Sequence, residues 1–70
     1  MVRTGKVMSV DSQGQSGVIR EGKKDFFFHV KDCKAGSIPP LHATVFFEKD
    51  EDFSTLVAIE VVVDQLPRRI

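Results

Sequence analysis

The stretch KKDFFFHVK, from Lys23 to Lys31, places three consecutive phenylalanines before a histidine and between lysines. It holds half of the six Phe residues of this 70-residue chain, which has no Trp and no Tyr. Because side chains of a β-strand alternate between its two faces, Phe26 and Phe28 should share one face. Phe27 and His29 should share the other. We therefore expect the first pair in a hydrophobic core. Phe27 should stand on the outer surface, unless a loop or a partner strand covers it.

Short runs of β-branched and aromatic residues recur on both sides of this stretch, bounded by clusters of Gly, Asp, Ser or Pro. No segment shows the sustained i, i+3, i+4 apolar spacing of an amphipathic helix. The pattern predicts an all-β domain of five strands, a number that is enough to close a small barrel. Its five strands are expected near Gly5–Val10, Gly17–Arg20, Asp25–Val30, Thr44–Glu48 and Leu56–Val63.

The segments between these strands predict how they connect. DSQGQSG (Asp11–Gly17) and EGKK (Glu21–Lys24) are typical of hairpin turns, so the first three strands should form an antiparallel meander. The segment Lys31–Ala43 holds consecutive prolines and cannot be a sheet interior, so we expect a crossing loop with one helical turn. A single domain should cover residues 1–66, with residues 67–70 as a frayed tail.

Composition limits the class of protein more than it names a partner. The formal net charge is zero, but residues 1–35 carry seven Lys or Arg against four Asp or Glu, which leaves that half at +3 and the other at −3. The single cysteine, Cys33, cannot form an internal disulfide, which favours a reducing compartment. No signal peptide or membrane span is evident. We expect a cytoplasmic location, no membrane association, and no metal or cofactor.

Four segments resemble the bacterial cold-shock proteins and the related cold-shock domains, in order and in spacing. The most specific is the Asp, apolar, Phe, apolar, His pattern from Asp25 to His29. The resemblance implies a five-stranded antiparallel Greek-key barrel, the OB-fold, and binding of single-stranded RNA or DNA through stacking on outward aromatics. The segments are GKV (Gly5–Val7), SGVI (Ser16–Ile19), KDFFFHV (Lys24–Val30) and LVAIEV (Leu56–Val61).

The chain departs from this family on the face that binds nucleic acid. Ser9 and Val10 stand where the family usually has Trp and Phe, and Gly14–Val18 lacks the Lys and both Phe of the second-strand motif. Val30 stands where the family commonly has another Phe, and Ile38 stands where the family has an aromatic residue in the following loop. Each stacked base is worth about 1–3 kcal/mol, so losing roughly four platforms removes on the order of 4 kcal/mol, near a thousandfold in affinity.

The first functional hypothesis is therefore a divergent single-stranded nucleic-acid-binding module of reduced affinity. Phe27 would stack one base, and His29 would contact a neighbouring base or a phosphate. Asp25 would accept a hydrogen bond from a base amino group. The lysines expected to follow the phosphate backbone are Lys6, Lys23, Lys24 and Lys31.

The second hypothesis is a barrel that has lost its ligand and serves as a protein-interaction module or homodimer. Alternation predicts that Val45 and Phe47 point inward, leaving Phe46 outward. The same rule places Val57, Ile59, Val61 and Val63 inward and Leu56, Ala58 and Val62 outward. Phe46, Leu56 and Val62 would then form an apolar patch, either a contact surface or covered by the tail residues Leu66 and Ile70.

Catalysis is the least supported class. The two histidines, His29 and His42, and the loop cysteine form no recognisable group of nucleophile, base and orienting residue. The acidic run Asp50–Asp52 has the character of a solvated loop and lacks the spacing of a calcium-binding EF-hand. We expect no enzymatic activity.

Overall fold

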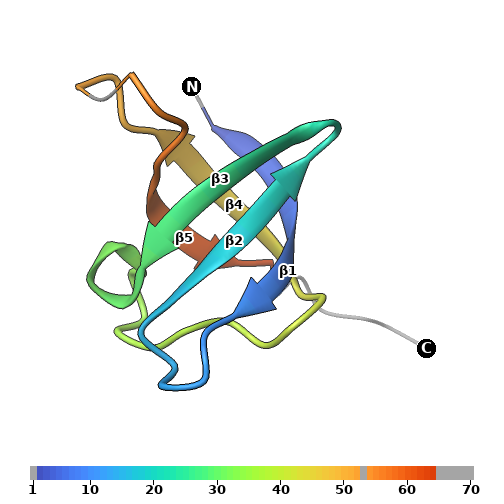
Figure 1. Ribbon diagram of the computed structural model, residues 1–70, viewed down its shortest axis with the longest axis vertical. Coiled ribbons are helices and arrows are strands. Elements are labelled where there is room, and N and C mark those ends of the chain that lie inside the picture. Colours follow the sequence, from blue (N-terminus) through green and yellow to red (C-terminus); the bar gives the residue numbers. More distant parts are fainter. Residues whose placement is uncertain (1, 53, 65–70) are drawn as a thin grey trace.

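The computed structural model describes residues 2–52 and 54–64, which form five β-strands and one turn of 3-10 helix (Figure 1). The all-β prediction is confirmed, and each strand lies within a few residues of its expected position. The elements are β1 (Arg3–Val10), β2 (Ser16–Glu21), β3 (Lys24–His29), η1 (Val30–Asp32), β4 (Thr44–Lys49) and β5 (Ala58–Val63).

The strands form one antiparallel sheet in the order β3-β2-β1-β4-β5, so the predicted meander of the first three is confirmed. The sheet curls until its two edges approach each other, as Figure 1 shows. The segment just before β5 is joined to β3 by a hydrogen bond from the Phe27 N–H to the Leu56 carbonyl, 3.0 Å long. Isolated parallel bridges join Phe27 to Val57 and Cys33 to Val61. The result is a curled, half-closed barrel.

The hairpin between β2 and β3 sets the register of the candidate site. Glu21 pairs with Lys24, so the turn consists of Gly22 and Lys23 alone. Gly22 has a φ of 62°, the left-handed conformation that tight hairpin turns require and that glycine adopts without steric cost. This turn aligns Val18 with Phe27 on the opposite strand.

The core lies inside the curl. Phe26 and Phe28 are buried, as the alternation predicted, and Phe26 meets Phe47 edge-on with ring centroids 4.9 Å apart. Among the described residues, no polar or charged residue is buried. The buried apolar residues are Val7, Ile19, Phe26, Phe28, Cys33, Val45, Phe47, Ala58 and Val61.

The alternation predicted for the last strand is wrong at Ala58, which is fully buried rather than outward. The cause is an irregularity in the pairing of β4 with β5: Phe46 pairs with Val62 but Glu48 pairs with Ile59, so β5 carries one extra residue. Glu60 lies in this bulge with a φ of 55°. Because a bulge inverts the phase of alternation, the side chains before it point to the opposite faces.

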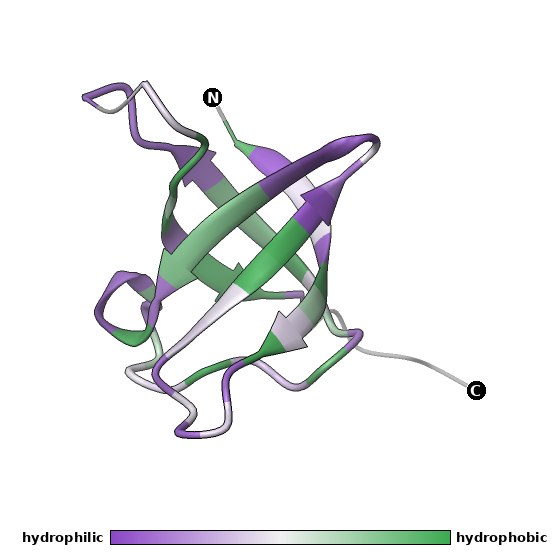
Figure 2. Cartoon of the chain, viewed as in Figure 1, coloured by the Kyte–Doolittle hydropathy of each residue, from purple (hydrophilic) through white to green (hydrophobic). Residues whose placement is uncertain are grey.

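The segment between β3 and β4 begins with η1 and then runs as a loop, as expected from Pro39 and Pro40. Hydrophobic colouring follows the middle of the strands, while hydrophilic colouring gathers at the β2–β3 turn and the β4–β5 loop (Figure 2). No helix among the described segments is long and apolar enough to cross a membrane. The predicted tail, including Leu66 and Ile70, lies outside the described residues.

Candidate nucleic-acid interface

The outward side chains of β1, β2 and β3 form three cross-strand rows, which we call the β1–β3 outer face. The first row is Lys6, Arg20 and Asp25. The second is Ser9, Val18 and Phe27. The third is Asp11, Ser16 and His29. The Asp11 N–H donates a hydrogen bond to the Ser16 carbonyl, and Ser16 pairs with His29. The face therefore passes from charged residues, through an apolar centre, to a polar end.

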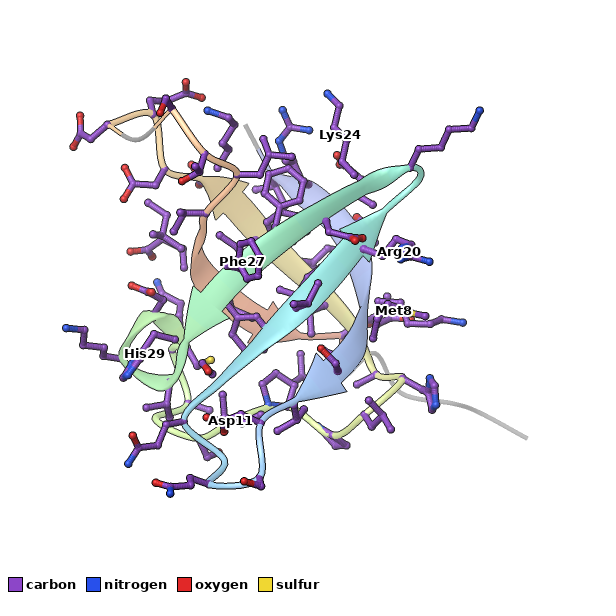
Figure 3. All side chains as sticks on the ribbon, viewed as in Figure 1. Met8, Asp11, Arg20, Lys24, Phe27 and His29 are labelled. Carbon is purple, nitrogen blue, oxygen red and sulfur yellow. The ribbon has the colours of Figure 1, made fainter. Side chains whose placement is uncertain are left out.

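Phe27 lies at the centre of this face. Its side chain is 62% exposed, whereas its neighbours in β3, Phe26 and Phe28, are buried. Figure 3 shows its ring on the outer side of β3, between Lys24 and His29. The alternative that a loop or partner strand covers Phe27 is therefore wrong for the described residues. An exposed ring on a rigid strand can accept a stacked base.

Asp25 is already bound by Arg20, a residue that was not among the predicted site residues. Arg20 donates from Nε to Asp25 Oδ1 at 2.8 Å and from its second terminal nitrogen to Oδ2 at 3.4 Å. These hydrogen bonds lower the pKa of the Asp25 carboxyl and raise the pKa of Arg20. Both side chains remain about half exposed, so solvent can reach the pair. A base amino group would have to share Asp25 with Arg20.

The register could have revealed Arg20. A turn made of Gly22 and Lys23 alone pairs the residues that flank it, and the next pair outward is Arg20 with Asp25. The signal was therefore present in EGKK, but using it requires knowing that the hairpin loop has two residues rather than three or four.

His29 is the last residue of β3 and the N-cap of η1. Its Nδ1 accepts a hydrogen bond from the Lys31 N–H at 3.2 Å. In the neutral ring, the hydrogen is then on Nε2, which is the nitrogen left to donate to a ligand. His29 is half-buried beside the exposed Phe27 and shares its side of β3. Donation to a phosphate or to a base carbonyl is compatible with this arrangement.

The four predicted lysines do not form one cluster. Lys6 lies on the outer face and pairs with Arg20, so it shares the charged row. Lys23 and Lys24 are exposed at the tip of the β2–β3 hairpin, and Lys31 is exposed in η1 at the other end of β3. Cations therefore stand at both ends of the strand that carries Phe27.

An open hollow of about 260 Å³ adjoins Phe27 on the same face. Ser9, which has a small side chain, and Gly17, which has none, are among the residues that line it. Gly17 itself cannot carry a side chain: a Cβ there would lie 2.5 Å from the Ser9 carbonyl oxygen and 2.9 Å from the Phe28 ring. The lining residues are Ser9, Val10, Asp11, Ser16, Gly17, Val18, Phe27 and Phe28.

Two of the three residues predicted for an apolar patch lie together on β4 and β5. Phe46 pairs directly with Val62, and both adjoin a hollow of about 190 Å³ with the exposed Val2. Leu56 does not join them, because it precedes β5 and packs against the core. We call Val2, Phe46 and Val62 the β4–β5 patch.

Cys33 belongs to the core, where its thiol donates to the His29 carbonyl at 3.7 Å. It is buried, and burial raises the pKa of its thiol, with the nearby Asp32 charge acting in the same direction. Within residues 2–52 and 54–64, no group of three or more His, Cys, Asp or Glu side chains could hold a metal ion. Neither observation adds a reactive centre to the outer face.

No family model matches the chain, and no curated protein sequence is significantly similar to it.

Proposed function

We propose that this protein is a single-stranded nucleic-acid-binding module of cold-shock type, built on an OB-fold Greek-key barrel. Two observations support the barrel. The five strands form one sheet in the order β3-β2-β1-β4-β5, and the Phe27–Val57 bridge brings the two ends of that sheet together. In an OB-fold the second and third strands carry the binding surface. Here these strands carry Val18, Phe27 and His29 on one side.

The observation that carries the proposal is the exposure of Phe27 at the centre of that surface. Phe27 is 62% exposed and does not belong to the buried core, and its ring offers a base a flat apolar partner. The charged row on one side of the ring and His29 on the other provide donors for phosphates on both sides. One aromatic platform predicts weaker binding than several would give.

An NMR titration of backbone amides with short oligouridine and oligothymidine tests this function. The shifts expected on binding are in β2 and β3, and they should weaken as salt increases because counterions compete for the cations. Phe27→Ala should weaken binding by about 1–3 kcal/mol. A matched Leu41→Ala control removes an exposed apolar side chain of the loop before β4, outside β2 and β3, and should bind unchanged. Equal affinity of the two variants would remove the stacking role.

A second function is favoured by the β4–β5 patch. Phe46 and Val62 are cross-strand partners, and Val2 and Val62 are exposed, so the patch is continuous and open to a protein partner or a second copy. In this function Phe46→Ser would reduce self-association while leaving oligonucleotide titrations unchanged. Light scattering over a range of concentrations would test it, and a constant monomer mass would count against self-association.

A further inference from the structure

The hollow beside Phe27 has a chemical character that the proposed function alone does not explain. Its lining combines apolar residues, among them Val18 and Phe27, with the polar residues Ser9, Asp11 and Ser16. The one charged residue of this lining is Asp11, and none of its residues is a Lys, Arg or His. A phosphate would be repelled here, whereas an uncharged base edge would not.

The Asp11 carboxylate is held in place within the β1–β2 turn. Its Oδ1 accepts the Gln15 N–H at 2.9 Å, and its Oδ2 accepts the Ser16 hydroxyl at 3.3 Å. The backbone N–H groups of Gly14 and Ser16 also interact with this carboxylate, so a ligand donor would share an exposed oxygen with the turn. The hydrogen bonds from this turn, chiefly that of Gln15, lower the pKa of Asp11, which keeps the group ionised at neutral pH.

The size of the hollow suits one base. Its volume of about 260 Å³ equals roughly eight or nine waters at their liquid volume, which is enough for a single pyrimidine ring. Because Phe27 and Asp11 line the same hollow, a base stacked against the Phe27 ring would lie in the hollow that the Asp11 carboxylate borders. An ionised carboxylate only accepts hydrogen bonds, so it distinguishes bases by the donors on their edges.

We infer that this hollow is a base subsite in which Asp11 favours bases with an exocyclic amino group, such as cytosine, over uracil and thymine. The inference rests on the proposed function, because it needs a base on Phe27. Cytosine presents an amino donor at the position where uracil presents a carbonyl oxygen, and a carboxylate is attracted to the first and repelled by the second. Asp11 would thus determine base preference, while Phe27 supplies affinity that is common to all bases.

Oligocytidine and oligouridine of equal length are the probes that test this inference, titrated at neutral pH and the same salt concentration. They differ in the hydrogen-bonding groups of one base edge and share the backbone charge and ring size. We expect oligocytidine to bind about fivefold or more tightly. In Asp11→Asn the side-chain oxygen can still accept the Gln15 N–H, so the turn should persist. The variant should bind oligocytidine and oligouridine with about equal affinity.

Asp52→Asn is the matched control, because it removes the same charge from an exposed position in the β4–β5 loop. It should keep the full preference for oligocytidine, which separates a local contact from a change in net charge. Equal binding of the two oligonucleotides by the wild type, or tighter binding of oligouridine, would overturn the inference while leaving the proposed function intact. Absence of binding by either oligonucleotide at low salt would overturn both.

Discussion

Arg20 and Asp25 form a bidentate ion pair between β2 and β3, with Arg20 Nε 2.8 Å from Asp25 Oδ1. The pair lies in the same row as Lys6 and next to the row of Phe27. Its guanidinium is the cation nearest in register to the exposed ring, and Asp25 neutralises it. Asp25 could therefore act in two opposite ways, as a ligand for a base or as a restraint on Arg20.

The geometry favours the restraint, and it leads to a prediction for Asp25→Ala. Removing the carboxylate frees the guanidinium to contact a phosphate and lowers the negative charge of the face. Affinity for oligouridine should rise a few-fold at low salt, and the salt dependence should become steeper by up to about one released counterion. Titrations at two salt concentrations measure both quantities. A loss of affinity for oligocytidine, whose bases carry the amino group that uracil lacks, would instead support Asp25 as an acceptor for a base amino group.

Phe26 and Phe27 are adjacent, but replacement by Leu should reduce the stability of the fold at Phe26 and leave it almost unchanged at Phe27. Phe26→Leu removes a buried ring that contacts Phe47 edge-on and lies 5.5 Å below the Arg3 guanidinium, so it should cost about 1 kcal/mol or more of unfolding free energy. Phe27→Leu should change stability by less than about 0.5 kcal/mol, because the ring is exposed. Urea denaturation measures both. Equal losses would mean that Phe27 is covered.

Gly17→Ala should destabilise the fold through a steric conflict. The added Cβ would lie 2.5 Å from the Ser9 carbonyl oxygen, and neither backbone can move without disturbing the β1–β2 pairing. We expect a loss of about 1–3 kcal/mol. Gly14→Ala is the comparison: its φ of 68° carries a conformational penalty of about 1 kcal/mol, but no atom lies within 4 Å of the new Cβ. Thermal denaturation of both variants should therefore rank Gly17→Ala as the less stable.

Acid should destabilise the β1–β2 turn through Asp11. Hydrogen bonds from the turn lower the pKa of this carboxyl in the folded protein, so the folded state binds fewer protons than the unfolded state. The resulting stabilisation is present above about pH 4 and is lost as pH falls through the folded-state pKa. Wild-type protein should therefore lose stability more steeply in that range than Asp11→Asn, in denaturation curves at several pH values. Parallel pH profiles of the two proteins would contradict this role.

Local rules were sufficient for β3 and β4. Strand alternation correctly placed Phe26, Phe28 and Phe47 inside and Phe27 outside, because both strands are short and free of bulges between those residues. The same rule failed at Ala58. The bulge at Glu60 inverts the phase, and nothing in LVAIEVVVD marks that position, since a glutamate with a positive φ has no local signature. Tertiary pairing with β4 imposes it.

The candidate site divides in the same way. Alternation in KKDFFFHVK was enough to identify an outward Phe27 and His29, since it depends on neighbouring residues of one strand. Only the folded sheet decided what surrounds them: the Arg20–Asp25 pair, the separation of the lysines, and the hollow that places Asp11 near Phe27. These arrangements join residues that lie on different strands or loops. They depend on cross-strand register and curvature, which packing of the whole barrel determines.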